Sequence, residues 1–273
     1  MTKQKVQKKK TNSSLEQSKN KKVSIQFNLD GFSFCIINLD TNKTIHFCEY
    51  TFTEKLETPD KLVFEIKQLF KEDIHLQQEF KEILVIHDNN LATIVPNRLF
   101  NENHLKEYLS LNIKTLATDF FAFDAINTID AKNVYVPFVN VNNYMFQNFG
   151  EFEYKHANSI LLEKLLQKEI TEEKSMFVNV THNHFTIVVI ENKKLLLSNT
   201  FTFETKEDFI YYILFTAEQL GLNTNEFPLY FMGDIEKESE IYNITYQYVR
   251  NVDFLESENS FFTNGTFSKH NHF

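Results

Sequence analysis

An internal repeat is the feature of this sequence that most restricts how the chain can fold. Residues 25–52 align without a gap with residues 176–203, at an offset of 151 that pairs, for example, Asn28 with Asn179. Identical residues are few, but both segments follow the order strand, polar turn, strand, polar turn, strand. The repeat therefore predicts two halves of similar structure.

Each of these triple-stranded segments is followed by a predicted helix. In the first half, Thr58 is placed to cap the helix and Pro59 suits its first position. In the second half, Thr205 and Asp208 form a variant capping box, and Gly221 is placed to end the helix. The apolar positions of both helices recur at helical spacing, so each helix is expected to bury one face.

A short and almost wholly apolar segment follows the helix in each half, at 82–90 and at 227–235. Such runs are typical of strands buried on both faces beside parallel neighbours. Each half is therefore predicted as β-β-β-α-β, an α/β unit with a mixed sheet. Residues 99–170 are predicted to form an α+β insert, with helices near 101–112, 141–148 and 159–168 and strands near 120–128, 133–138 and 151–156.

Charge is distributed unevenly along the chain. The net charge is −9, but residues 1–22 carry +7 and the remainder carries −16. The basic segment has no apolar core, so it is neither a secretory signal nor an anchor, and we expect a disordered tail. Transient contact with nucleic acid or another anionic surface is the alternative. The halves are placed at 23–98 and 171–255, and residues 256–273 are expected to form a polar tail.

Composition excludes several classes of protein. The body is acidic and the chain has two arginines, Arg98 and Arg250, which makes nucleic acid an unexpected partner. No stretch approaches the eighteen apolar residues that a membrane span needs. Two cysteines are too few for a secreted disulfide scaffold. These absences together predict a cytoplasmic protein.

The two cysteines lie in strands that are predicted to pair. A symmetric hairpin loop within residues 40–43 pairs residues whose numbers sum to 83, which places Cys35 directly opposite Cys48. Directly opposed strand positions give strained disulfide geometry. We therefore expect two reduced thiols without a redox function.

The order β-β-β-α-β, occurring twice, resembles the duplicated ribonuclease H-like fold of actin, Hsp70 and sugar kinases. Two further segments, NVYVPF at 133–138 and NYMFQNFGEFEYKHANSILLEKLL at 143–166, resemble a bacterial family catalogued as domain of unknown function 3822. The similarity covers residues 22–255. It implies an actin-like fold similar to that of the type IV pilus assembly actin homologue, and the family has no established activity.

The resemblance to actin-like ATPases implies a nucleotide between the halves, held by the first hairpin turn of each half. Such turns are typically Asp-x-Gly followed by small polar residues, since Asp positions magnesium and Gly admits backbone amides to the phosphates. Here Asp30 and Gly31 are adjacent and precede the bulky Phe32, which favours an ordinary hairpin turn with positive φ. The second turn, residues 179–184, has neither Asp nor Gly. A third, adenosine-binding turn has the single Gly233 where two glycines are usual.

The sequence accordingly predicts a catalytically inactive protein, without cofactor, metal site or catalytic residues, that binds a protein partner as an interaction scaffold. No two glycines are closer than twelve positions, which excludes a P-loop and a Rossmann fingerprint. Neither turn carries Lys or Arg to offset the about four negative charges of a triphosphate. The alternative is a nucleotide-binding switch that binds ATP and magnesium weakly. Its site would comprise Asp30, Gly31, Asn179, Thr181, Gly233 and Asp234.

Overall fold

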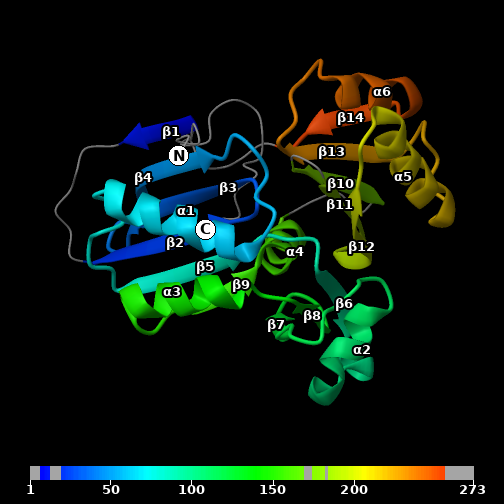
Figure 1. The fold of residues 1–273 in the computed structure, drawn as a ribbon. Coiled ribbons are helices and arrows are strands. Elements are labelled where there is room, and N and C mark those ends of the chain that lie inside the picture. The colour runs from blue at the N-terminus through cyan, green and yellow to red at the C-terminus, as the bar shows by residue number, and fades with distance from the viewer. Residues whose placement is uncertain (1–6, 13–19, 169–173, 182–183, 256–273) are drawn as a thin grey trace.

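The computed structural model describes residues 7–12, 20–168, 174–181 and 184–255. Three sheets organise this part of the chain (Figure 1). The first sheet has the strand order β1-β4-β3-β2-β5-β9. Its strands are β1 (Gln7–Asn12), β2 (Lys21–Phe27), β3 (Gly31–Asn38), β4 (Lys43–Thr51), β5 (Glu82–His87) and β9 (Glu153–His156).

The second sheet has the order β12-β11-β10-β13-β14, and a small third sheet has the order β6-β8-β7. The second sheet is built from β10 (Ser175–Val180), β11 (His184–Glu191), β12 (Lys194–Thr202), β13 (Pro228–Gly233) and β14 (Asn251–Phe254). The small sheet is built from β6 (Ala92–Pro96), β7 (Ala122–Ile126) and β8 (Ala131–Tyr135).

Both large sheets show the predicted β-β-β-α-β order. In the first, β2 pairs antiparallel with β3 and parallel with β5. In the second, β10 pairs antiparallel with β11 and parallel with β13. The crossover helices are α1 (Pro59–Glu72) and α5 (Lys206–Gln219), and the predicted caps at Thr58 and Thr205 are both present. The duplicated α/β architecture is confirmed.

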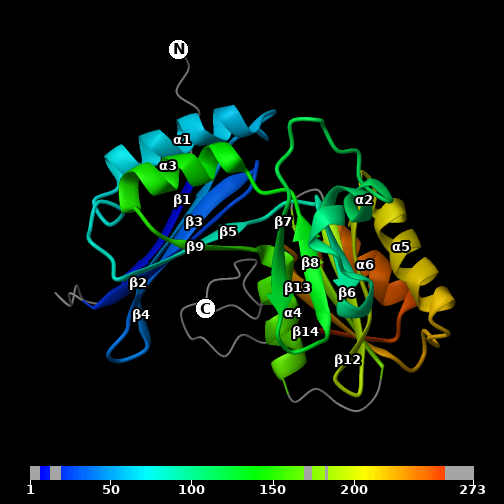
Figure 2. The same ribbon diagram turned by 90° about the horizontal axis from the view of Figure 1, so that it is seen from below.

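Helices cover one face of each large sheet. On the first sheet, α1 packs beside α3 (Val139–Phe149), and Figure 2 shows the two helices side by side over the strands. On the second sheet, α5 packs beside α6 (Glu240–Tyr248). Inward-facing side chains of strands and helices form one apolar core in each half.

Helix α4 (Ala157–Gln167) occupies the space where the three sheets approach one another (Figure 2). Its first turn contacts Leu84 and Ile86 of β5. Further along, Leu161 and Leu165 belong to one cluster with Phe177 of the second sheet and with side chains of the small sheet. Because neighbours surround it, α4 is apolar on most of its circumference.

The repeat alignment needs a correction within its first two strands. The turn after β2 follows Phe27 and the turn after β10 follows Val180, so these strands are equivalent at an offset of 153. The loop after β3 has two residues more than the loop after β11, which restores the offset of 151 for the third strand. A shift by two residues leaves every side chain on the same face of its strand. The apolar pattern alone therefore cannot distinguish the two alignments.

The predicted insert over 99–170 is not a single unit. Strand β9 extends the first sheet beside β5, and α3 packs on α1. The separate unit comprises β6, β7, β8 and the helix α2 (Leu105–Ser110), which follows the short 3-10 turns Asn97–Leu99 and Glu102–His104. Strand β6 was not predicted, and its cross-strand neighbour β8 lies about forty residues further along the chain.

The N-terminal segment also departs from the prediction of a disordered tail over 1–22. Residues Gln7–Asn12 form β1, which pairs antiparallel with β4 at the edge of the first sheet. Lys21 and Lys22 already belong to β2. Backbone pairing requires no apolar side chains, so composition did not reveal it. The tail predicted over 256–273 lies outside the described residues.

The predicted register of the cysteine hairpin is wrong by one residue. Cys48 lies opposite Phe34, and Cys35 lies opposite Phe47. The loop is centred one residue earlier than predicted, and a bulge in β4 shifts the pairing again. A one-residue slip sends the side chain to the other face. The two buried, free cysteines therefore lie on opposite faces of the sheet, where they cannot form a disulfide with each other.

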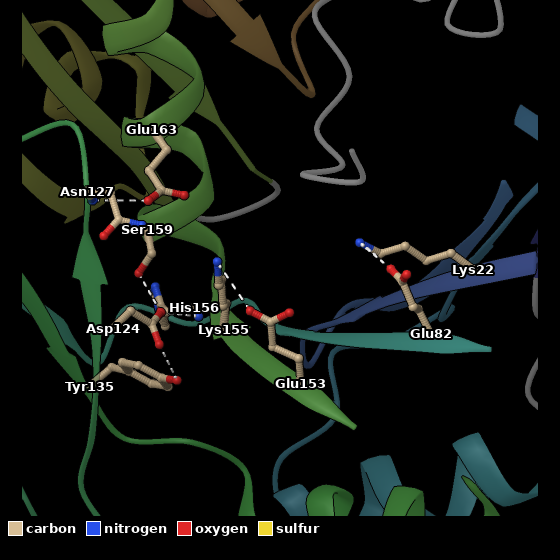
Figure 3. A network of polar contacts seen from close by, with 10 residues as sticks. All are labelled: Lys22, Glu82, Asp124, Asn127, Tyr135, Glu153, Lys155, His156, Ser159 and Glu163. Atoms are coloured by element: carbon tan, nitrogen blue, oxygen red, sulfur yellow. Dashed lines mark hydrogen bonds and ion pairs between the residues drawn. The ribbon is translucent and has the colours of Figure 1, made fainter. Parts of the chain in front are cut away.

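A buried polar network joins the small sheet to the first sheet and to α4 (Figure 3). Asp124 of β7 accepts hydrogen bonds from the hydroxyls of Tyr135 and Ser159, at 3.0 and 2.6 Å, and from the backbone amide of His156 at 2.8 Å. Burial raises the pKa of Asp124. Three donors thus stabilise a carboxyl group that would otherwise be costly to bury.

Two neutral histidines, His87 and His156, lie side by side on β5 and β9 next to this network. In each ring Nδ1 accepts a backbone N–H, at 3.1 Å, so the proton resides on Nε2. Burial lowers the pKa of His87 to about 4 and that of His156 to about 3. An unfolded histidine titrates near 6.5. Stability present above pH 6.5 is therefore lost as the pH falls through this window.

We predict that His156→Gln flattens the pH dependence of stability. Between pH 6 and pH 5, each buried histidine contributes up to about 1.4 kcal/mol per pH unit to the slope of the free energy of unfolding. Between these pH values, the free energy of unfolding of the variant should change by about that amount less than that of the parent. Urea denaturation of both proteins at several pH values measures the difference. His104→Gln, an exposed position, is the control and should keep the parental slope. Equal slopes for His156→Gln and the parent would contradict the prediction.

We predict that β1 protects the edge of the first sheet. Deleting residues 1–12 leaves the backbone groups of β4 unpaired on one side, so the free energy of unfolding should fall by about 1–3 kcal/mol and the protein should self-associate more readily. Deleting residues 1–6 keeps β1 and should change neither property. Denaturation and light scattering of both truncations measure this, and identical behaviour would show that β1 does not contribute.

Candidate functional site

A cavity of about 430 Å³ lies between the two halves, at the ends of their central strands. Its size is within the range of small-molecule sites. The first half contributes most of the wall and the second half contributes Thr181 and Asp234. We call this cavity the interlobe cleft. Its polar lining residues are Gln26, Asn28, Asp30, Ser33, Glu49, Thr51, Thr53, Lys55, Asp88, Thr181 and Asp234.

In the first turn of the cleft, the side chain of Asn28 is hydrogen-bonded to the backbone of the turn. The Oδ1 atom of Asn28 accepts hydrogen bonds from the backbone amides of Asp30 and Gly31, at 2.9 and 2.8 Å. In a phosphate-binding turn, backbone amides of this kind would face the oxyanion. The Nδ2 group of Asn28 donates to Asp88 at 3.1 Å, which holds the amide in this orientation. Asn28 therefore occupies the donors that a phosphate would use.

Gly31 serves a different purpose from the one predicted. Its φ is not in the left-handed region, so the interpretation of Asp30-Gly31 as a primed turn is wrong. A Cβ at position 31 would lie 2.7 Å from the carbonyl oxygen of Tyr50. Glycine is required because β3 begins in close contact with the backbone of β4.

The second turn satisfies its own polar groups in a similar way. The backbone amide and the hydroxyl of Thr181 both donate to the carbonyl oxygen of His184, at 2.9 and 2.7 Å. The amide of Asn28 makes the equivalent bond to the carbonyl of Gly31 at 3.1 Å. Thr181 is thus the structural equivalent of Asn28, whereas the gapless alignment paired Asn28 with Asn179.

An aspartate follows the parallel crossover strand in each half. The amide of Asp88 donates to the carbonyl of Phe27 at 3.1 Å, and the amide of Asp234 donates to the carbonyl of Val180 at 2.7 Å. The Asp88 carboxylate also accepts from Gln26 at 3.3 Å. The pseudo-symmetry of the fold therefore brings one aspartate from each half to the same cleft.

The electrostatics of the cleft are acidic. Four carboxylates line it, from Asp30, Glu49, Asp88 and Asp234, against one ammonium group from the exposed Lys55. Among the described residues, no group of three or more His, Cys, Asp or Glu side chains is arranged to hold a metal ion.

The imidazole of His184 lies close to the charges of this cleft. Burial lowers its pKa, the nearby carboxylates of Asp88 and Asp30 act in the opposite direction, and Lys55 lowers it further. His184 was not among the residues that the sequence predicted for a nucleotide site.

The six residues predicted for a nucleotide site divide into two groups. Asp30, Gly31, Thr181 and Asp234 line the cleft, whereas Asn179 and Gly233 do not. Gly233 sits at the end of β13 with a φ of +89°, where a Cβ would collide with the carbonyl of Val180, so its role is the close approach of two strands.

Three cleft residues were missed as site residues by sequence reasoning. Asn28 was interpreted only as a repeat position, and neither Asp88 nor Lys55 was among the predicted site residues. The position of Asp88 directly after a buried parallel strand was a usable signal. Lys55 carries no such signal, since it reaches the cleft only because the chain after β4 folds back on the first turn through Leu56 and Leu29.

We predict that Asn28→Ala destabilises the protein by about 1–2 kcal/mol, because two backbone amides lose their acceptor. Asp30→Ala, in the same turn, is the matched control and should change the free energy of unfolding by less than about 0.5 kcal/mol. Chemical denaturation of both variants is the measurement. If the order of the two effects were reversed, Asn28 would not be what holds the turn.

Comparisons with known proteins agree with this architecture. The sequence profile described as "Protein of unknown function (DUF3822)" matches residues 10–252. A solved protein of unknown function with an actin-like ATPase fold, from Bacteroides thetaiotaomicron VPI-5482, is 21% identical, with a TM-score of 0.78 over 87% of this chain and 91% of that chain. A chain of the PilM–PilN type IV pilus biogenesis complex is 11% identical, with a TM-score of 0.52 over 85% of this chain and 87% of that chain. No curated protein matches significantly.

None of the helices in the described part of the chain has the length and apolarity needed to cross a bilayer.

Proposed function

We propose that this chain, which belongs to the DUF3822 family of proteins of unknown function, is a catalytically inactive, actin-like interaction scaffold of the cytoplasm. The observation that carries the proposal is the hydrogen bonding of the first turn. There the side chain of Asn28 takes both amides that a phosphate would need.

The charge of the cleft supports the same proposal. A triphosphate would bring about four negative charges close to the carboxylates of Asp30, Asp88 and Asp234, with Lys55 as the cation of the lining. The hydroxyl of Thr181 in the second turn does not offset this repulsion, because it already donates to the carbonyl oxygen of His184. Tight binding of a nucleotide would require both turns to rearrange and a counter-charge to be supplied.

A binding role is supported by the fold of a neighbour and by a second cavity. PilM, whose fold is similar, has been solved in a complex with PilN. In the present chain, a polar cavity of about 390 Å³ lies apart from the cleft, with no lining residue in common. A scaffold with an unused nucleotide cleft would bind its partner through such a surface.

We predict that magnesium and ATP neither stabilise the protein nor are turned over. With 5 mM ATP, a dissociation constant of about 50 μM would add roughly 2.7 kcal/mol to the free energy of unfolding. We expect a change in melting temperature below about 1 °C and phosphate release equal to the buffer blank. Magnesium chloride alone is the control.

A shift of several degrees with ATP, abolished by Asp234→Ala or Lys55→Ala, would contradict the proposal and favour the alternative, a nucleotide-binding switch. ATP hydrolysis that is abolished by Asp30→Ala would also contradict the proposal, because the reaction would then depend on the first turn. Neither result would alter the fold, so circular dichroism of each variant serves as the folding control.

A further inference from the structure

The second cavity lies in a groove between the small sheet and the second sheet. Strand β6 is an edge of the small sheet and β12 is an edge of the second sheet (Figures 1 and 2). Residues of both strands border this cavity. Residues 112–114, which follow α2, and Asn158 in the first turn of α4 close its remaining sides. We call it the edge groove. Its lining residues are 90–94, 112–114, Asn133, Asn158, 198–200 and Thr202.

Within the described residues, the two edges border the groove with backbone groups that no second strand pairs, and the amide of Thr200 donates to the Oδ1 atom of Asn199 at 3.0 Å. Within the described residues, each edge strand is hydrogen-bonded to a neighbouring strand on one side only. Residues 198–202 of β12 run along the groove for about 13 Å, the length of four to five extended residues. Exposed edges of this kind are templates for an added strand.

A buried side chain faces the groove with one of its polar atoms unpaired. Asn133 is fully buried and its Nδ2 donates to the hydroxyl of Ser159 at 2.9 Å. Ser159 in turn donates to Asp124, so it has no proton to return to Asn133. The Oδ1 atom of Asn133 has no hydrogen-bond partner among the described residues. Leaving a buried acceptor unpaired is costly, and a donor from a ligand would remove that cost.

The lining chemistry indicates what kind of ligand fits. Side-chain amides and hydroxyls dominate, and Lys114 is the charged residue of the lining. No aromatic ring lines the groove, so a sugar or a nucleobase would find no stacking surface. Asparagine amides combine a donor with an acceptor, as peptide groups do. This set matches the backbone of an extended peptide.

We propose that the edge groove binds an extended segment of a protein partner, which adds as a strand along β12. The proposal rests on the scaffold function and names the class of its partner. A Ser, Thr, Asn or Gln side chain of the segment donates to Oδ1 of Asn133. An acidic residue of the segment lies near Lys114.

The test is a selection of displayed random twelve-residue peptides on the immobilised full-length protein, with counter-selection on the blank matrix, followed by binding measurements on the Asn133→Leu variant. Leucine removes the unpaired acceptor, so this variant should be at least as stable as the parent while binding the selected peptides at least ten-fold more weakly. Lys114→Ala, at an exposed position, should weaken acidic peptides several-fold. Asn148→Ala, exposed on α3, is the matched control and should bind as the parent does.

Amide hydrogen exchange locates the bound peptide. We expect added protection in residues 198–202, and binding that is unchanged by magnesium and ATP. The proposal is overturned if no peptide is enriched, if selected peptides bind Asn133→Leu and Lys114→Ala as tightly as the parent, or if protection falls outside the groove. Concentration-dependent dimerisation that buries β12 would also overturn it, because the occupant would then be a second copy. Nucleotide binding in the cleft would defeat the proposed inactivity but would leave this result standing.

Discussion

The burial of α4 among three sheets is the constraint on which the rest of the structure depends. Its first turn packs on β5, its apolar residues pack on the second sheet, and Ser159 connects it to the polar network of the small sheet. A helix with solvent on one side would need only one apolar stripe, whereas α4 is apolar on most sides. The relative placement of the two halves, and hence the existence of a cleft between them, follows from this shared helix.

The pseudo-symmetry of the halves explains the chemistry of the cleft. In each half, the amide of the residue after the first strand donates to a carbonyl oxygen at the start of the second strand, and an aspartate follows the parallel crossover strand. The same topology in an ATPase would direct backbone amides and carboxylates at a phosphate and its metal. Here the side chain of Asn28 accepts hydrogen bonds from two backbone amides of the first turn, and Thr181 donates to the carbonyl oxygen of His184 in the second. The two halves share the backbone topology, but these donors are bonded within the turns themselves.

Part of the site was within reach of the sequence and part was not. Asp30, Gly31, Thr181 and Asp234 were candidates because the resemblance to actin-like ATPases implies a nucleotide held by these turns, and these four line the cleft. Asn179 was selected through an alignment shifted by two residues, which a pattern of period two cannot detect. Lys55 reaches the cleft through the path of an irregular segment, and irregular segments carry no periodicity.

The sequence by itself determined the element order of both halves, the caps of α1 and α5, and the buried face of each helix. These features depend on neighbours within a few positions along the chain, where spacing and residue type act directly. The tertiary structure alone decided the pairing of β1 with β4, the register of the cysteine hairpin, the union of β6 with β8, and the edge groove. Each of these joins segments through backbone hydrogen bonds or long-range packing, and backbone groups are the same in almost every residue. A sequence cannot mark such contacts, so they emerge only when the whole chain is folded.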